Sequence, residues 1–301
     1  MDRLKCIGKL QPAETDLSIV EQESVLCLTF AMTQKDTQNT LKFARDLAAK
    51  AGEIQWSGHT EGFQQSSKIS DVDIVTDIDK RCEELIVSAL EKEYPDFGIL
   101  GEEGTDRSGK DESPYRWIID PLDGTTNYIH NFPVYSVSIA LFDQDTPLLG
   151  VVHSAPLRRT YTAIRGQGSF LNGEKIHTSG TRELSKALVA TGVPYDRATS
   201  RENNVNYISH VIPQVQGLRR TGAVSIDTAL VGQGVLDGYW ELKIRLWDFA
   251  AGILIAREAG AVGSYVHIGD DYYNVVCAAP AIYPILIGKL HEIGDSFSTI
   301  S

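Results

Sequence analysis

The sequence predicts a layered α/β or α+β fold in which sheets are covered by helices. Helix-like and strand-like segments mix from about residue 37 to residue 261, with no repeat, low-complexity tract or linker between them. The segment WDFAAGILIAREAGA (247–261) reads as a helix that is apolar nearly all round, and such a helix must be buried. A mixture of strands and buried helices is typical of domains built from packed layers.

Helices are expected first along the chain. From Thr37, the apolar residues of LKFARDLAAKA recur at spacings of three and four, which predicts an amphipathic helix. The segment 73–96 predicts a second amphipathic helix, which Pro95 ends. The side chains expected to face inward from this helix are Leu85, Ile86, Ala89 and Leu90.

The apolar pattern then changes to that of β-strands. Segments rich in β-branched and aromatic residues alternate with turn residues. The segments 148–155 and 159–166 are expected to pair as neighbouring strands of a meander. A second half of the chain repeats the mixture of strands and helices, and Gly260 is placed to end the last helix. Strands are expected at 97–100, 117–120, 134–142, 148–155, 159–166, 187–192 and 236–242, a glycine-rich turn with a short edge strand at 166–176, and helices at 200–211, 223–234 and 247–261.

Composition bounds the domain organisation and the class of protein. The 301 residues suit one large domain or two modest ones, and residues 1–33 show no sustained period, so we expect a loosely attached extension before a domain at 34–295. The net charge of −12 argues against a nucleic-acid-binding surface, which needs a basic patch. Four cysteines without a CxxC pair and the lack of a long apolar run indicate a cytoplasmic protein that does not enter membranes.

The segment WIIDPLDGTTNY (117–128) places two carboxylates at the end of an apolar strand. Pro121 forces a turn after Asp120, so that Asp123 can come back toward it, and Gly124 permits close backbone approach. Two carboxylates about 5 Å apart repel by about 3 kcal/mol at an effective dielectric constant of about 20, and a hard divalent cation relieves this repulsion. The alternative is that both aspartates only cap and form the turn.

Other acidic residues favour the cation. Glu102 and Glu103 lie between glycines directly after an apolar strand, and Asp248 opens the apolar helix at 247–261. A charge at the start of a core helix is costly unless it is paired or bound to a metal. Asp73, Asp77 and Asp79 lie at the start of another helix, where acids are also common for local reasons alone.

Three of these segments carry a family resemblance. GEEG (101–104), WIIDPLDGTTNY and WDFAAGILIAREAG resemble, in this order and at this separation, the signatures of the inositol monophosphatase family. The resemblance covers roughly residues 37–290. It implies an αβαβα sandwich of alternating helix and sheet layers, as in the sugar-phosphatase fold, and a magnesium-dependent, lithium-sensitive phosphatase that forms a homodimer.

The resemblance also implies which residues would bind metal. Glu102, Asp120 and the Leu122 carbonyl would hold a first Mg²⁺ ion, and Asp120, Asp123 and Asp248 a second. Glu102 would also help to hold a weaker third ion. Free amides at the start of a short helix after Gly124 provide a phosphate site next to these ions.

Catalytic and substrate-binding roles follow from the same resemblance. Thr125 would orient the attacking water, with Asp79 hydrogen-bonded behind it, and Glu102 would assist. Lys68 matches a lysine of the family stretch that ends at Asp79, with no assigned role. Residues implied to contact phosphate or the rest of the substrate are Asp123, Gly124, Thr125, Gly222, Ala223, Val224 and Glu241.

One position departs from the family pattern. After Gly222 the family commonly has Ser or Thr, whereas this chain has Ala223, which leaves the substrate preference open. Arg219 and Arg220 would either contact a second phosphate or lie on a surface, and the surface interpretation is the simpler.

The expected activity is hydrolysis of a phosphate monoester, either inositol monophosphate or a related polyol or sugar phosphate. The chain has no GxxxxGK[ST], HExxH or GxSxG motif, which excludes the enzyme classes that use them. Sibling activities remain as alternatives, namely hydrolysis of fructose 1,6-bisphosphate, histidinol phosphate or 3′-phosphoadenosine 5′-phosphate. A regulatory binding protein that keeps the fold is the alternative from another class.

Overall fold

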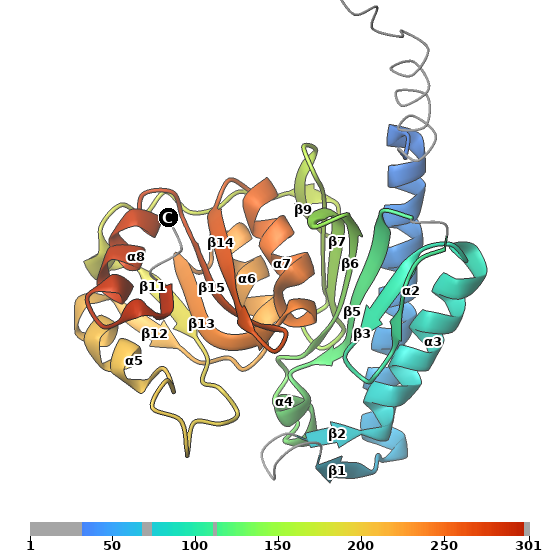
Figure 1. Ribbon diagram of the computed structural model, residues 1–301, viewed down its shortest axis with the longest axis horizontal. Helices are drawn as coiled ribbons and strands as arrows, with labels where there is room; N and C mark the ends of the chain where they lie inside the picture. Colours follow the sequence, from blue (N-terminus) through green and yellow to red (C-terminus); the bar gives the residue numbers. More distant parts are fainter. Residues whose placement is uncertain (1–31, 68–73, 111–112, 298–301) are drawn as a thin grey trace, which may run out of the picture. The chain divides into compact units, whose positions relative to one another are not determined.

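Two large sheets and the helices around them make up most of the computed structural model, which describes residues 32–67, 74–110 and 113–297 (Figure 1). From Gln34 onward the chain forms one unit. The extension expected at 1–33 lies outside the described residues except for Met32 and Thr33, and Lys68 and Asp73 lie outside them as well. None of the described helices combines the length and the apolar character needed to cross a membrane.

The first sheet has eight strands in the order β10-β9-β8-β7-β6-β5-β3-β4. Neighbouring strands from β5 to β10 are antiparallel, as expected for a meander, whereas β3 runs parallel to β5. The strands are β3 (Gly98–Gly101), β4 (Asp106–Arg107), β5 (Tyr115–Asp123), β6 (Ser136–Asp143), β7 (Thr146–Ser154), β8 (Arg159–Ile164), β9 (Gly168–Leu171) and β10 (Glu174–Lys175).

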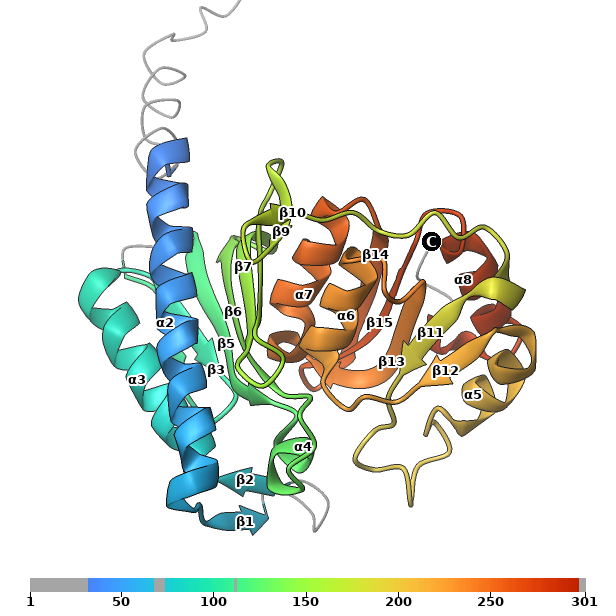
Figure 2. The same cartoon turned by 180° about the vertical axis from the view of Figure 1, so that it is seen from behind.

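Helices α2 (Gln34–Glu61) and α3 (Asp77–Glu93) cover the outer face of this sheet (Figure 2). The prediction that the second helix begins at residue 73 is wrong, because Ile74–Thr76 form strand β2, which pairs with β1 (Gln65–Ser67). Thr76 has an extended backbone, and its hydroxyl accepts a hydrogen bond from the Ile78 amide, so the helix begins immediately after it.

Helices α6 (Val224–Gly232) and α7 (Leu246–Glu258) form the middle layer between the two large sheets. As predicted, α7 is buried along most of its length and ends before Gly260, whose φ is +97°. The two helices approach closely because Gly252 of α7 lies against α6, where an added Cβ would be 1.9 Å from the Thr228 Oγ1 atom.

The second sheet has five strands in the order β12-β11-β13-β15-β14. Strand β11 is parallel to both of its neighbours, whereas β15 is antiparallel to β13 and β14. The sequence patterns predict no element after residue 261, but the structure has β14, β15 and a last helix there. The strands are β11 (Leu188–Thr191), β12 (Gly217–Arg219), β13 (Gly238–Arg245), β14 (Val262–Gly269) and β15 (Tyr272–Ala278).

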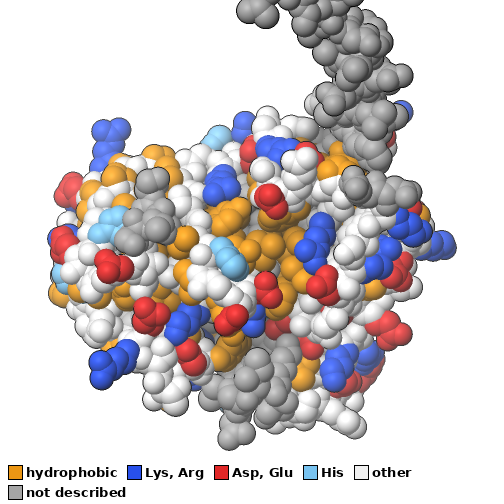
Figure 3. Space-filling model, in the orientation of Figure 1, with side chains coloured by type: hydrophobic (Ala, Val, Ile, Leu, Met, Phe, Trp, Pro, Cys, Tyr) orange, Lys and Arg blue, Asp and Glu red, His pale blue; other side chains and the backbone are white. Residues whose placement is uncertain are grey.

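Helices α5 and α8 cover the outer face of the second sheet and complete the predicted αβαβα order of layers (Figures 1 and 2). Helix α5 begins later than expected, since Asn204 before it has a φ of +69°. The remaining elements are α4 (Thr125–Ile129), α5 (Val205–Val211), α8 (Tyr283–His291), η1 (Leu184–Lys186), η2 (Ile212–Gln214) and η3 (Asp295–Phe297). On the face drawn in Figure 3, acidic and basic side chains are interspersed around a central apolar area.

Candidate active site

A pocket of about 280 Å³ lies where β5, β13 and the N-termini of α6 and α7 meet. It collects residues from segments that are far apart in the sequence. Of the residues predicted from the sequence, those that line it are Glu102, Asp120, Leu122, Asp123, Gly124, Thr125, Gly222, Val224, Glu241 and Asp248. Asp79 and Ala223 do not line the pocket and are buried behind its wall.

Parallel pairing of β3 with β5 brings Glu102 to Asp120. Gly101 lies opposite Ile119 in this register, and the Glu102 amide donates to the Ile119 carbonyl at 3.2 Å. The loop after β3 is fixed further by Glu83 of α3, whose carboxylate accepts from the Glu103 amide at 2.8 Å. Glu102 and Asp120 therefore lie at the same end of the sheet.

The two aspartates of WIIDPLDGTTNY have different hydrogen-bond partners. Asp120 is 1% exposed, and its Oδ1 atom accepts from the Leu122 amide at 2.9 Å. Asp123 accepts from the Val224 amide at 3.1 Å and from the Ser225 amide and hydroxyl at 2.7 and 2.5 Å. Asp123 thus caps α6 and joins the large sheet to the middle layer.

Asp248 reaches the pocket from the first turn of α7. Its Oδ2 atom accepts from the Arg245 amide at 2.7 Å, which satisfies one of the free amides at the start of the helix. The turn directs one carboxylate of the middle layer toward those of the large sheet. The predicted set of four acids therefore lines one pocket, contributed by β5, α7 and the loop after β3.

These carboxyl groups destabilise one another when they are ionised. Burial, and then the charge of Glu102, raise the pKa of Asp120 well above its usual value, and the same two causes raise that of Asp248. Burial raises the pKa of Asp123 to about 6, against the lowering effect of its Ser225 and Val224 hydrogen bonds. Such clustered acids favour a bound cation.

The donor set suits a hard divalent cation, since it offers carboxylate oxygens and the Leu122 carbonyl in one pocket. The described part of the chain nevertheless has no group of three or more acidic, histidine or cysteine side chains already arranged to hold a metal ion. The chemistry of the residues fits a hard divalent cation, and the side chains would have to move closer together to bind it.

Thr125 and Asp79 form a pair beside these acids. The Thr125 hydroxyl lies 3.0 Å from Asp79 Oδ1 and 3.1 Å from the Leu122 carbonyl oxygen. The other carboxylate oxygen of Asp79 accepts from the Thr76 amide and hydroxyl at 2.8 and 2.5 Å. Burial raises the pKa of Asp79 to about 6 despite the opposing Thr76 hydrogen bond.

Gly124 allows the chain to pass close to α6 at the start of α4. Its φ is +92°, and an added Cβ would lie 3.0 Å from the Val134 carbonyl oxygen and 3.3 Å from the Ala223 Cβ. The departure from the family pattern at Ala223 is therefore at a buried position, where Ala223 precedes α6 without a side-chain cap.

Glu241 of β13 faces the same pocket from the second sheet. It is 8% exposed and accepts a short hydrogen bond from the Tyr239 hydroxyl. Burial raises the pKa of Glu241 to about 7, against the lowering effects of Tyr239 and Arg220. The Gly192 backbone packs closely against the Glu241 carboxyl group, since an added Cβ at Gly192 would lie 1.9 Å from Glu241 Oε1.

Several pocket residues were not predicted. Arg219 and Arg220 are both exposed, as the surface interpretation expected, but Arg220 also lines the pocket whereas Arg219 does not. Most of the unpredicted residues have no local signal that points to the pocket, and neither has Ser225, which binds Asp123 from 102 residues away in the sequence. The further lining residues are Thr126, Val193, Pro194, Tyr195, Lys243, Ile244, Arg245, Trp247 and Tyr272.

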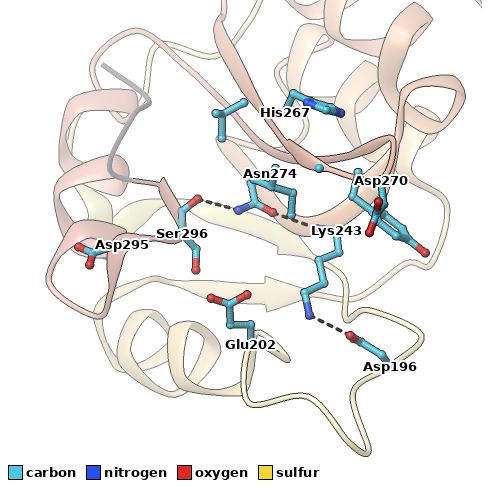
Figure 4. A pocket seen from close by; sticks show the side chains of 12 residues that line it. Asp196, Glu202, Lys243, His267, Asp270, Asn274, Asp295 and Ser296 are labelled. Carbon is cyan, nitrogen blue, oxygen red and sulfur yellow. Dashed lines mark hydrogen bonds and ion pairs between the residues drawn. The ribbon is translucent and has the colours of Figure 1, made fainter.

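A second cavity of about 620 Å³ adjoins this pocket and shares Lys243 and Tyr272 with it (Figure 4). Half of the labelled residues that line it are acidic, and Lys243 points across it toward Asp196. Lys243 therefore stands between the two cavities.

Comparisons with known proteins agree on one family. The model of the inositol monophosphatase family matches residues 36–294. An inositol-1-monophosphatase of Synechocystis sp. is 39% identical over 231 residues, which are 76% of this chain and 79% of that protein. The Nus factor SuhB of Escherichia coli is 34% identical over 261 residues, 85% of this chain and 97% of that protein. The structure of an inositol monophosphatase from Anabaena (Nostoc) is similar with a TM-score of 0.76 and 31% identity, and covers 85% of this chain and 97% of its own.

Proposed function

The chain belongs to the inositol monophosphatase family, and on this premise we propose that it is a magnesium-dependent phosphatase of inositol monophosphate or a related small polyol phosphate. One observation carries the proposal. The four acids Glu102, Asp120, Asp123 and Asp248 line a single pocket together with Thr125, although they come from distant segments. A purely structural role would not require such a cluster of like charges.

We assign the metal ligands as the resemblance implies. Glu102, Asp120 and the Leu122 carbonyl would hold one ion, Asp120, Asp123 and Asp248 a second, and Glu102 would help to hold a third. When bound, magnesium would supply positive charge that offsets the negative charge of the phosphoryl oxygens, and it would lower the pKa of a bound water molecule. In support of this assignment, burial and then the charge of Glu102 raise the pKa values of Asp120 and Asp248.

Thr125 and Asp79 would position the attacking water and hold its proton. The Thr125 hydroxyl donates to Asp79 at 3.0 Å, which leaves its oxygen free to accept a hydrogen bond from water. With its pKa near 6, Asp79 is mostly ionised at neutral pH and close enough in basicity to accept a proton through Thr125.

The substrate would lie between the two sheets. The amides of Gly124 and Thr125 at the start of α4 would bind phosphate oxygens, and Glu241 would accept a hydrogen bond from a substrate hydroxyl. Asp123 would contact the ring of the substrate. Backbone groups of Gly222 and Val224 line the same wall, while Ala223 supports it from behind.

A regulatory binding function is the second candidate. The observation in its favour is the 34% identity to a protein named Nus factor SuhB. A regulatory binding function would explain that similarity, but it gives no role to the Thr125–Asp79 pair. Catalysis is therefore the preferred proposal. We further propose, from the resemblance alone, a cytoplasmic homodimer.

Phosphate release from a panel of substrates tests the proposed function. The panel contains inositol 1-phosphate, fructose 1,6-bisphosphate, histidinol phosphate and 3′-phosphoadenosine 5′-phosphate, each assayed with Mg²⁺, without Mg²⁺ and with Mg²⁺ plus Li⁺. We expect the fastest release from inositol 1-phosphate, only with Mg²⁺, and inhibition by millimolar Li⁺. Release from another member alone would identify a sibling activity, and release from none would favour the binding function.

A further inference from the structure

A loop from Gly192 to Asn204 forms one wall of the candidate active site. It connects β11 to α5, and Gly192, Val193, Pro194 and Tyr195 line the pocket. Tyr195 is 61% exposed at the rim. Any group that fixes this loop therefore determines the shape of the pocket on the side of the second sheet.

Both ends of the loop are fixed to β13 through Asn204. The Asn204 amide donates to the Thr191 hydroxyl at 2.7 Å and to the Gly192 carbonyl at 2.5 Å, and its oxygen accepts from Trp240 Nε1 at 2.9 Å. Asn204 is only 1% exposed. These buried hydrogen bonds hold the base of the loop but do not reach its middle.

Lys243 of β13 reaches the middle of the loop. Its Nζ atom forms an ion pair with Asp196 at 2.8 Å and donates to the Ser200 hydroxyl at 2.8 Å (Figure 4). The side chain of Lys243 is 19% exposed and that of Asp196 is 47% exposed, so the pair is partly shielded from water. Hydrogen bonds from the Arg197 and Thr199 side chains, by contrast, end on Pro194 and Asp196 within the loop.

The backbone of Lys243 is in a conformation that lysine seldom adopts. Its φ is +55°, at the irregularity of β13 between Glu241 and Ile244. The conformation is supported by Asn274, whose side-chain oxygen accepts from the Lys243 amide at 3.0 Å. Glycine would adopt this φ at less steric cost, so a lysine here indicates a function for its side chain.

We infer that Lys243 is a positioning residue that holds residues 193–200 against the substrate pocket. The inference rests on the proposed function for its effect on catalysis. Lys243 follows Glu241 by two residues, so one strand carries both a proposed substrate contact and the anchor of the opposite wall. Loss of the anchor should loosen substrate binding without moving the Thr125–Asp79 pair.

The variant Lys243→Met tests this inference in two ways. Trypsin cleavage after Arg197 and Arg201, followed by mass spectrometry, reports loop opening without any need for activity. We expect this cleavage to accelerate, and the KM for inositol 1-phosphate to rise about fivefold with kcat changed less than about twofold. Lys243→Arg should restore both readouts toward wild type, because it keeps the charge.

Lys289→Met is the matched control. Lys289 is 29% exposed and pairs with Glu292, which is 49% exposed, so it resembles the Lys243–Asp196 pair but lies on α8. Its loss should change neither readout. Asp196→Asn is the second variant, since it removes the anchor from the loop side and leaves β13 intact, and it should reproduce the effects of Lys243→Met.

Two results would overturn the inference. In the first, cleavage at Arg197 and Arg201 stays at the wild-type rate in both Lys243→Met and Asp196→Asn. In the second, the loop opens in these variants but the KM is unchanged. If the wild type releases no phosphate from any substrate, the proposed function fails instead, and unchanged cleavage would still refute the loop anchor by itself.

Discussion

The Thr125 hydroxyl is the group on which the proposed water attack depends most. We expect Thr125→Val, which keeps the shape but removes the hydroxyl, to lower kcat about 100-fold or more. Thr125→Ser keeps the hydroxyl within reach of Asp79 and should retain most of the activity. Steady-state phosphate release measures both, and equal losses in the two variants would show that the hydroxyl is not needed.

Glu241 should make the stability of the metal-free protein depend on pH. Burial raises its folded-state pKa from 4.5 to about 7, so the protonated form is favoured by folding. Its contribution to stability is therefore present below about pH 4.5 and is lost as the pH rises through about 7, up to about 3 kcal/mol.

Chemical unfolding in a chelator between pH 5 and 8 tests this prediction. The free energy of unfolding of wild type should fall with rising pH more steeply than that of Glu241→Gln, which has no titrating group at this position. Parallel pH profiles for the two proteins would contradict the predicted shift.

At the residue scale, the sequence predicted the acids but not their partners. Asp120, Asp123 and Asp248 stand in motifs that predict a charged site, and all three line the pocket. The Ser225 and Lys243 contacts could not be predicted, because each joins segments that only the fold brings together. Asp123 and Ser225, for example, are 102 residues apart.

Close packing of α6 against α7 sets the position of the α6 N-terminus at the element scale. An added Cβ at Gly252 would lie 1.9 Å from Thr228 Oγ1 and 2.9 Å from the Ser225 carbonyl oxygen. We expect Gly252→Ala to lower the free energy of unfolding by about 1–3 kcal/mol through overpacking.

The matched substitution is Gly288→Ala in α8, where an added Cβ meets no atom within 4 Å. It should be neutral or stabilise the protein by about 0.5–1 kcal/mol, because alanine favours helix more than glycine. Equal effects of the two substitutions in thermal unfolding would show that the contact between α6 and α7 is not tightly packed.

Elements with a clear periodic pattern of apolar residues could be predicted from the sequence. Elements that form only because two strands pair could not. The buried α7 and the meander follow from apolar patterns in the sequence. The segment Ile74–Thr76 continues the apolar pattern of the following helix, but it pairs with Gln65–Ser67 as a strand. The segment forms a strand because a partner strand lies nine residues earlier in the sequence. The apolar pattern of the segment gives no information about that partner.

Magnesium should stabilise the whole molecule by joining distant parts of the chain. Glu102, Asp120 and Asp123 come from the large sheet and its loops, whereas Asp248 comes from the middle layer. At a concentration 100 times its Kd, a ligand that binds only the folded state adds about 3 kcal/mol of stability.

The control for this effect is potassium chloride at equal ionic strength, since a net charge of −12 makes any salt stabilising to some degree. Differential scanning calorimetry should show a larger rise in Tm with Mg²⁺ than with the control, and a smaller magnesium effect in Asp248→Asn. The same Tm in both salts would argue against a specific magnesium site.

At the scale of the molecule, the layered architecture was predictable because the sequence motifs and the alternation of elements agree. The order of layers, with α6 and α7 between two sheets, is the one that the family resemblance implied. The motifs do not predict the opposite wall of the pocket. That wall is formed by β13 and the loop at 192–204, whose residues share no sequence pattern.

The most direct test of magnesium-dependent hydrolysis at the acid cluster is the rate of phosphate release from inositol 1-phosphate as a function of Mg²⁺ concentration. We predict no release by wild type without metal, a rise to saturation with Mg²⁺, and no activation of Asp120→Asn at any concentration. An Asp120→Asn protein that is folded and keeps near wild-type, magnesium-dependent release would contradict the account.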